Sequence, residues 1–266
     1  MTEDSYLYFC RKVKQLIGLD LTAYKDRQMK RRLGTFMLRL EVNDYIELAK
    51  LLEKDKEALD KFRNFLTINV SEFFRNPEQF QTLKDKIIPS LMSPGKPLRI
   101  WSAGCSDGSE PYTILMILEE LGIRNYQLIA SDIDLEILER AKVGIYKKDS
   151  LRNVPPSLLD KYFIKGQDEL YQFSPQLSKQ VKFKRQNLLE DPYDKDLDLI
   201  LCRNVVIYFT EEAKNKVFLK MAESLRPEGV LFVGGTESIL TPKSLGLQTV
   251  LPFFYRKIGE SKTAAL

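Results

Sequence analysis

The chain carries two patterns of hydrophobic positions, one before about residue 67 and another after about residue 97. Through residues 5–66 the apolar side chains recur every three or four positions, which predicts helices. The first of these helices would bury Tyr6, Phe9, Val13, Leu16 and Ile17. Between the two parts, residues 78–91 predict one further helix. From residue 97 onward, short unbroken apolar runs alternate with helical patterns, which predicts a doubly wound, mostly parallel sheet flanked by helices.

Residues 98–132 have the pattern of a strand, a glycine-containing turn, a helix and a second strand. The turn contains Gly104 and Gly108, and glycines at such a turn let the backbone pass close to a bound nucleotide. Asp132 ends the second strand, where an acidic side chain can accept hydrogen bonds from ribose hydroxyls. The turn lacks the third glycine of the dinucleotide fingerprint. The stretch therefore predicts a nucleoside site and leaves the kind of nucleoside open.

The rest of the α/β part supplies further predicted strands. They span residues 181–187, 197–204 and 229–235, and residues 247–257 can add a last pair. Residues 144–180 are polar, are interrupted by prolines and are too long for an ordinary connection. We therefore expect this segment to carry structure of its own, with residues 171–173 as a short strand.

The composition excludes several kinds of chemistry. The 266 residues include no histidine, which excludes Ser-His-Asp catalysis, Cys-His catalysis and His-ligated metal sites, and no metal site is predicted. The three cysteines, Cys10, Cys105 and Cys202, form no CxxC pair and are too few for a disulfide framework. No apolar run approaches the ~18 residues of a membrane span, and the acidic N-terminus is unlike a signal peptide. We therefore expect a cytoplasmic protein without membrane insertion.

The net charge of +4 is unevenly distributed along the chain. Nine basic residues and only two acidic ones lie between Arg11 and Arg39. Several of the basic residues fall on neighbouring turns of a predicted helix and form a cationic ridge, namely Arg27, Lys30, Arg31 and Arg32. Such a cluster is often only a solvated helix face, but it also suits an acidic partner.

Polar residues and one glycine stand at or just beyond the ends of the predicted strands. They are Gly104, Glu110, Asp132, Asn187, Arg203 and Asn204. The carboxyl ends of parallel strands meet at one edge of the sheet, which is where ligands bind in open α/β sheets. Any one of these residues could be polar only because a buried strand surfaces there, but their coincidence favours a common site. Cys105 and Cys202 have no histidine to activate them, so we expect them to pack in the core or a turn.

Five segments form a specific pattern in their order and spacing. They are NVSEFFR at 69–75, WSAGCSDGSEPY at 101–112, ASDID at 130–134, QNLL at 186–189 and CRNVVIYF at 202–209. This pattern resembles the chemotaxis receptor glutamate methyltransferases of the CheR type, and the resemblance covers essentially the whole chain.

The resemblance implies an α/β, Rossmann-like S-adenosylmethionine-dependent methyltransferase domain with a small antiparallel β subdomain insertion, preceded by a small all-α N-terminal domain. The expected boundaries are 1–76 for the helical, receptor-docking domain, 77–96 for a linker helix, 97–266 for the methyltransferase domain and about 162–182 for the inserted subdomain.

The family transfers a methyl group from S-adenosylmethionine to glutamate carboxylates on chemoreceptor cytoplasmic helices, which leaves S-adenosylhomocysteine. Carried over position by position, the catalytic residues nearest the methyl group would be Arg75 and Tyr208. The cofactor contacts would be Asn69, Ser71, Arg75, Gly104, Glu110, Asp132, Asn187, Leu188, Arg203 and Asn204. The acidic methylation helices of the receptor would dock on Arg27, Lys30, Arg31 and Arg32.

The chain departs from the family pattern at several positions. The cofactor turn often reads STGEE but here reads SDGSE at 106–110, so Glu110 carries over and the role of Asp107 stays open. Ser71 replaces a frequent threonine and keeps the hydroxyl. Members that tether to a receptor pentapeptide tend to carry Gly-Gly in the inserted subdomain, whereas residues 165–180 contain only Gly166. We expect a monomer that docks directly, without that tether and without nucleic acid.

Glutamate is already ionised at neutral pH and needs no general base, which suits a chain without histidine. A nicotinamide-dependent oxidoreductase also uses a glycine turn and a ribose-binding acid. The missing third glycine and the missing histidine proton donor disfavour it here, although a tyrosine or a lysine could donate the proton. A non-catalytic receptor- or RNA-binding module is the other alternative, motivated by the basic helix. Arg75, Asp132 and Asn204 argue against it, and only an activity measurement decides.

Overall fold

Two units make up the fold, and their membership does not follow chain order. The computed structural model describes residues 2–66 and 71–259. Residues 1–68 and 206–216 form a helical unit, and residues 69–205 and 217–266 form an α/β unit. The expected domain boundaries stay a prediction, but the segment 206–216 joins the helices although it lies far along the chain.

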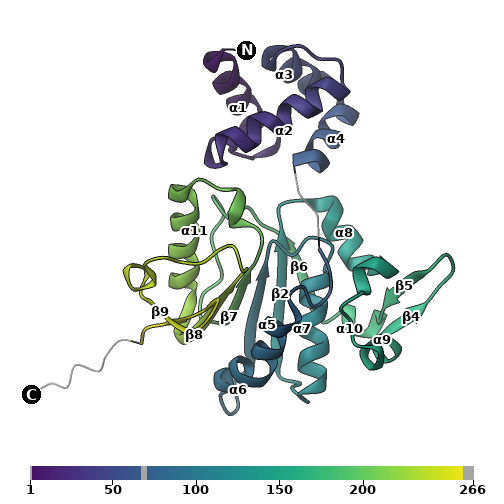
Figure 1. Cartoon of the computed structure of the whole chain (residues 1–266), viewed down its shortest axis with the longest axis vertical. Coiled ribbons are helices and arrows are strands. Elements are labelled where there is room, and N and C mark those ends of the chain that lie inside the picture. The colour runs from purple at the N-terminus through teal and green to yellow at the C-terminus, as the bar shows by residue number, and fades with distance from the viewer. Residues whose placement is uncertain (1, 67–70, 260–266) are drawn as a thin grey trace, which may run out of the picture. The chain divides into compact units, whose positions relative to one another are not determined.

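The helical unit buries an aromatic core, as its apolar spacing predicts. The ring of Phe9 lies 5.6 Å from that of Tyr45 and 5.8 Å from that of Phe62. Gly18, with φ of 70°, ends the first helix, and Asp44 caps the third by accepting two backbone N–H groups. The elements are α1 (Glu3–Ile17), the 3-10 turn η1 (Leu21–Ala23), α2 (Asp26–Arg39), α3 (Tyr45–Lys54), α4 (Lys56–Leu66) and the 3-10 turn η4 (Val206–Tyr208) (Figure 1).

The α/β unit is built on a seven-stranded sheet in the order β6-β2-β1-β7-β8-β10-β9. Its parallel strands are β1 (Leu98–Ala103), β2 (Tyr126–Asp132), β6 (Val181–Arg185), β7 (Leu197–Cys202) and β8 (Leu225–Val233). The hairpin of β9 (Leu247–Leu251) and β10 (Phe254–Lys257) adds antiparallel strands at one edge. The connecting helices are α7 (Ser109–Glu120), α8 (Leu135–Val143) and α11 (Glu211–Ser224), of which the part from Val217 onward belongs to this unit. The predicted doubly wound sheet is confirmed.

A small antiparallel sheet lies at the end of the α/β unit opposite the β9–β10 hairpin (Figure 1). It comprises β3 (Ile145–Lys147), β5 (Leu170–Phe173) and β4 (Phe163–Lys165), with η3 (Lys148–Leu151), α9 (Pro156–Tyr162) and α10 (Pro175–Ser178) around it. The small sheet begins at Ile145, before residue 162, where the inserted subdomain was expected to start. Phe173 stacks on Tyr112 of α7 with ring centroids 4.2 Å apart, which anchors the small sheet to the larger one. The predicted fold class, including an inserted β subdomain, is thereby confirmed.

The helix expected over 78–91 is confirmed as one unbroken helical segment, but its middle departs from α-helical geometry. The segment consists of α5 (Pro77–Thr82), a π-helical turn η2 (Leu83–Ile87) and α6 (Ile88–Leu91). Pro89 explains the change, because its ring has no N–H and would clash with the carbonyl four residues earlier in a regular helix.

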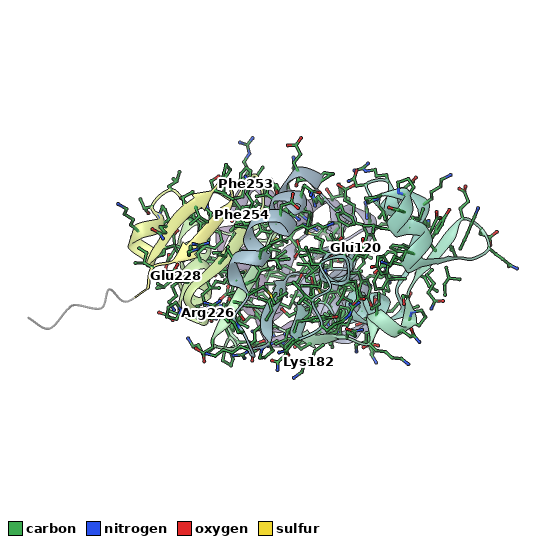
Figure 2. The ribbon with its side chains drawn as sticks, turned by 90° about the horizontal axis from the view of Figure 1, so that it is seen from below. Glu120, Lys182, Arg226, Glu228, Phe253 and Phe254 are labelled. Atoms are coloured by element: carbon green, nitrogen blue, oxygen red, sulfur yellow. The ribbon has the colours of Figure 1, made fainter. Side chains whose placement is uncertain are left out.

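A buried carboxylate, Asp198, lies at the end of the sheet opposite the strand carboxyl ends. Its Oδ2 accepts the Arg99 N–H over 2.7 Å, and its Oδ1 pairs with the Arg226 guanidinium. Figure 2 looks onto this side and shows Arg226 and Glu228 toward the hairpin, with Glu120 toward the small sheet. Within the described part of the chain, no helix combines the length and apolar character needed to cross a membrane.

Candidate active site

The turn after β1 contains three residues in the left-handed region. Gly104, Ser106 and Gly108 have φ angles of 73°, 49° and 87°. A Cβ on Gly104 would lie 2.4 Å from Cγ2 of Val205, so a larger residue would displace Val205. The Gly104 N–H donates to the Ser131 carbonyl over 2.8 Å, which ties the ends of β1 and β2 together. The turn therefore brings bare backbone to the strand ends, as a nucleoside site requires.

Asp132, at the end of β2, faces this turn. Its Oδ2 accepts the Ser106 N–H over 2.9 Å, and its Oδ1 accepts the Asp134 N–H over 3.1 Å. Burial raises the pKa of Asp132, and these backbone hydrogen bonds partly offset the rise. A carboxylate can accept about four hydrogen bonds, so ligand hydroxyls can share these oxygens.

Asp107, Cys105 in the turn and Cys202 at the end of β7 all make contacts that stabilise the fold. The Asp107 Oδ1 accepts the N–H and the hydroxyl of Ser109 over 3.0 and 2.7 Å, so Asp107 satisfies one backbone N–H in the first turn of α7. Cys105 and Cys202 are buried, and burial raises the pKa of both thiols well above the ordinary value. Both are therefore neutral packing groups, as predicted.

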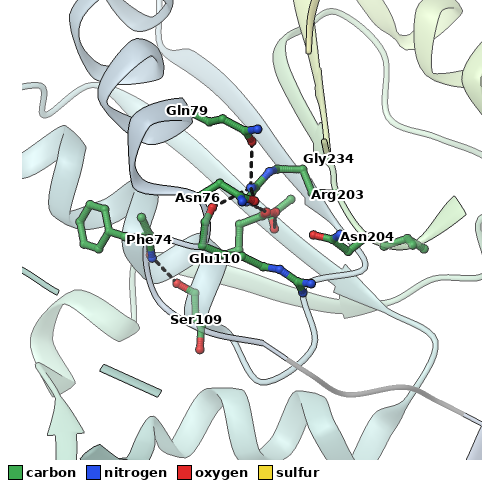
Figure 3. A network of polar contacts seen from close by, with 12 residues as sticks. Phe74, Asn76, Gln79, Ser109, Glu110, Arg203, Asn204 and Gly234 are labelled. Carbon is green, nitrogen blue, oxygen red and sulfur yellow. Dashed lines mark hydrogen bonds and ion pairs between the residues drawn. The ribbon is translucent and has the colours of Figure 1, made fainter. Parts of the chain in front are cut away.

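Arg203, just after β7, holds two distant segments together (Figure 3). Its Nη1 lies 3.3 Å from Glu110 Oε2, and its Nη2 donates to the Arg75 carbonyl over 2.7 Å. The same Nη2 also donates to Asn76 Oδ1 and Gln79 Oε1 over 3.0 and 3.1 Å. Arg203 thus links the first turn of α7 to the segment that carries Arg75.

The Arg203 side chain is 2% exposed and lies between two aromatic rings. Its guanidinium carbon is 4.8 Å from the ring centroid of Phe80 and 4.8 Å from that of Phe232. Burial lowers the pKa of Arg203, and the Glu110 carboxylate counteracts this shift. Glu110 in turn accepts the Ser102 hydroxyl over 2.8 Å through its other oxygen. Direct contact of Arg203 with a cofactor stays a prediction.

A buried carboxylate that the sequence analysis missed, Glu237, organises the loop after β7. Its Oε1 accepts the Val205 N–H over 2.8 Å, and its Oε2 accepts the N–H groups of Gly234, over 2.9 Å, and of Asn204. A Cβ on Gly234 would lie 2.4 Å from Glu237 Oε2, so the glycine makes room for the carboxylate. Asn204 is held with φ of 60°, in the left-handed region.

Asn187 and Leu188 lie in a tight turn after β6. The Asn187 side-chain oxygen accepts the Leu189 N–H over 3.0 Å, and its N–H donates to Asp191 over 2.7 Å. The Leu188 carbonyl accepts the Lys220 ammonium over 3.2 Å. Because β1, β2, β6 and β7 are parallel neighbours, this turn lies at the same edge as Gly104, Asp132 and Arg203.

The remaining predicted contacts are spread over the chain. Asn69 lies outside the described residues, and Ser71 is partly buried. Arg75 precedes Asn76 in a strained segment, where Phe74 and Asn76 have φ of 50° and 62°. Tyr208 belongs to the helical unit, where its carbonyl accepts the Lys25 N–H over 2.9 Å. Arg75 belongs to the α/β unit, and the joint action of Arg75 and Tyr208 stays a prediction.

Two members of the predicted cationic ridge on α2, Lys30 and Arg32, interact with other groups of the protein. The Lys30 ammonium lies 2.8 Å from Glu3 and 3.0 Å from Asp26 carboxylate oxygens. Arg32 is partly buried and donates to the Phe65 carbonyl, and burial lowers its pKa.

Arg27 and Arg31 behave differently from their neighbours on α2. Both are exposed, and neither side chain has an ion-pair or hydrogen-bond partner among the residues that the structure describes. They are therefore the members of the ridge whose charge is available to a partner.

Comparisons with known proteins agree with this arrangement. Residues 69–249 match the family described as CheR methyltransferase, SAM binding domain, and residues 4–67 match CheR methyltransferase, all-alpha domain. The chain is 45% identical over 258 residues to a chemotaxis protein methyltransferase of Listeria monocytogenes, covering 96% of this chain and 98% of that one. It is 34% identical to the chemotaxis protein methyltransferase of Escherichia coli, covering 86% of this chain and 83% of that one. The chain therefore belongs to the CheR methyltransferase family.

Proposed function

We propose that this protein transfers a methyl group from S-adenosylmethionine to glutamate side chains of chemoreceptor cytoplasmic helices and forms glutamate methyl esters. The observation that carries the proposal is the convergence of Gly104, Asp132, Asn187 and Arg203 at the carboxyl ends of four adjacent parallel strands. Family membership supports the reaction, and the relatives' printed names support chemotaxis.

The residues at this edge suit a cationic ligand that carries ribose hydroxyls. Asp132 offers carboxylate oxygens at the turn, and Gly104 leaves the backbone accessible. When bound, S-adenosylmethionine supplies an activated methyl group on a sulfonium. The acceptor glutamate is ionised at neutral pH, so the protein only has to orient it. We assign this orientation to Arg75 through charge-assisted hydrogen bonds, and we assign Tyr208 as the second catalytic residue, on the strength of the family pattern.

We also propose that the protein works as a cytoplasmic monomer that docks on the receptor without a pentapeptide tether. The support for direct docking is the absence of a Gly-Gly pair from residues 165–180 and the available charge of Arg27 and Arg31.

The first test is calorimetric titration of the purified protein with S-adenosylmethionine, S-adenosylhomocysteine and NAD. Binding of the first two compounds but not of NAD is expected. The acceptor is tested by incubating the protein with a purified chemoreceptor cytoplasmic fragment and S-adenosylmethionine labelled in its methyl group. Base-labile label on glutamate residues of the fragment is the expected result. Binding of NAD, or intact cofactor binding with no receptor methylation, would overturn the proposal.

Reversing the charge of the available arginines should weaken receptor docking. We expect the Arg27→Glu/Arg31→Glu variant to raise KM for an acidic receptor fragment about tenfold at low salt, and less at high salt because screening already weakens the attraction. Its affinity for S-adenosylhomocysteine should not change. The matched control is Lys61→Glu/Arg63→Glu on α4. An equal loss in the control, or no dependence on salt, would argue against docking through α2.

Replacing Glu237 by glutamine should damage the loop that carries Asn204. Three N–H donors face the carboxylate, and a glutamine can offer only its single oxygen to them, so one donor must face an NH2 group. We expect Glu237→Gln to lower the free energy of unfolding by about 2–3 kcal/mol and the affinity for S-adenosylhomocysteine by about tenfold.

The control for this loop variant is Asp198→Asn, which removes a buried carboxylate from the opposite end of β7. It should lower the thermal midpoint and leave affinity for S-adenosylhomocysteine near that of the wild type. If both variants lose affinity in proportion to their stability, Glu237 has no specific effect on the cofactor site.

A further inference from the structure

The segment that carries Arg75 has a backbone conformation that residues with a Cβ rarely adopt. Phe74 and Asn76, on either side of Arg75, have φ of 50° and 62°, in the left-handed region. For a bulky residue such as Phe74 this conformation costs free energy and persists only where the surroundings hold it. The contacts that hold Phe74 therefore also set the direction in which the Arg75 side chain leaves the backbone.

A buried hydrogen bond holds Phe74 to α7. The Phe74 N–H donates to the Thr113 hydroxyl oxygen over 3.1 Å, across 39 residues of the chain. The same hydroxyl donates its proton to the Ser109 carbonyl, one turn earlier in α7, over 2.8 Å. Because a hydroxyl has one proton, this second bond leaves its lone pairs for the Phe74 N–H. Thr113 is fully buried, so water cannot take the place of the acceptor.

Packing alone does not account for the hydroxyl of Thr113. Residues 111–118 of α7 are all buried, and Thr113 is the one residue among them with an aliphatic hydroxyl. Valine has nearly the same shape and would fill this position without a polar group to satisfy. The hydrogen bond to Phe74 is therefore the contact that the hydroxyl adds to the fold.

The residues next to Phe74 are held by other elements. The Phe73 N–H donates to the Ser150 carbonyl of η3 over 3.2 Å. On the other side, Arg203 donates to the Arg75 carbonyl over 2.7 Å. Neither bond acts on Phe74 itself, and a rotation about its φ or ψ would turn Arg75 relative to the rest of the site. Of these three anchors, the one from α7 therefore controls the strained residue directly before Arg75.

We infer that Thr113 is a positioning residue for methyl transfer. Its hydroxyl holds Phe74 in the left-handed conformation, and this conformation aims the Arg75 guanidinium at the acceptor carboxylate. A small misplacement of a group that orients a reactant lowers the rate steeply, so one buried hydrogen bond can matter for turnover. The inference rests on the proposed function and deepens it, because it names a residue that acts through Arg75.

The test uses single-turnover methyl transfer by the full chain to a chemoreceptor cytoplasmic fragment, with S-adenosylmethionine and the fragment both saturating. Thr113→Val should lower the rate about twentyfold, because the Phe74 N–H loses its buried acceptor and the segment relaxes. KM for the fragment and the affinity for S-adenosylhomocysteine should stay within about twofold of the wild-type values. Thr113→Ser keeps the hydroxyl and should restore the rate to within about threefold of wild type.

A double-mutant cycle shows whether Thr113 acts through Arg75. In the Arg75→Ala background, Thr113→Val should change the residual rate less than about twofold, because the group that it positions is gone. The matched control is Ser224→Ala, which removes a buried hydroxyl of α11 that bonds to the carbonyl four residues earlier. This control should keep the wild-type rate. If valine unfolds the protein, Thr113→Ala carries the same test, because it also removes the acceptor.

A folded Thr113→Val variant with the wild-type rate overturns the inference, and so does a loss of rate that Thr113→Ser does not reverse. A loss of the same size in the Arg75→Ala background also overturns it, because Thr113 would then support the fold and not Arg75. A wild-type protein that binds cofactor but does not methylate the receptor fragment would instead overturn the proposed function.

Discussion

Arg75→Ala is expected to reduce methyl transfer about a hundredfold while cofactor affinity falls much less, because Arg75 is assigned to orient the attacking carboxylate. The backbone of the segment around Arg75 should keep its position in the variant. Arg203 donates a hydrogen bond to the backbone carbonyl of residue 75, which alanine retains. Single-turnover methylation with saturating S-adenosylmethionine separates this effect from binding, which is measured by calorimetry.

Arg75→Lys is the matched variant. It keeps the positive charge and loses the planar, two-pronged donor geometry, so an intermediate rate is expected. A thermal melt of each variant controls for folding. A methylation rate unchanged in Arg75→Ala would remove Arg75 from the chemistry, and an equal loss of rate and cofactor affinity would make it a cofactor-binding residue only.

The regular parts of this fold are predictable because local pattern and tertiary structure agree. The short apolar runs after residue 97 form the parallel strands. The first helix ends at Gly18, because glycine adopts the left-handed backbone conformation without steric cost. Asp132 lies at the end of β2, as the strand pattern required, and its oxygens face the glycine turn. The strands, the helix end and the position of Asp132 at a strand end depend on residues within a few positions of each other, whereas the contact of Asp132 with the turn follows from the parallel pairing of β1 and β2.

The features that escaped prediction depend on partners far apart in the chain. Glu237 binds backbone N–H groups, which every residue except proline carries, so no side-chain pattern marks the residues 32 and 33 positions away. The only available signal was its place just after a strand end, behind Gly234. The segment Val206–Lys216 joins the helical unit across more than half the chain, which hydrophobic periodicity cannot reveal.

The basic ridge shows a third limit. Composition identifies Arg27, Lys30, Arg31 and Arg32 as one cluster, but the charge available to a partner depends on intramolecular contacts. Lys30 is neutralised by Glu3 and Asp26, and Arg32 is turned onto the Phe65 carbonyl. Only the folded unit distinguishes these two from Arg27 and Arg31.

Arg203→Met is expected to cause the largest loss of stability among these variants. Methionine can keep the packing between Phe80 and Phe232, but it removes every donor to Glu110, the Arg75 carbonyl, Asn76 and Gln79. The variant leaves a poorly solvated Glu110 carboxylate without its cation, so we expect a loss of about 3–5 kcal/mol in the free energy of unfolding. Chemical denaturation with urea measures this loss.

The same change should reduce turnover beyond what lost stability explains, because it frees the segment that carries Arg75. Adding Glu110→Gln to Arg203→Met removes the unpaired charge and should restore about 1–2 kcal/mol of stability without restoring turnover. A recovery of stability without a recovery of turnover would distinguish two roles of Arg203. Its ion pair with Glu110 stabilises the fold, and its hydrogen bond to the Arg75 carbonyl positions the active site. Strict additivity of the two substitutions would mean that Glu110 and Arg203 do not interact. If the folded molecules of the Arg203→Met variant turn over at the wild-type rate, Arg203 does not position Arg75.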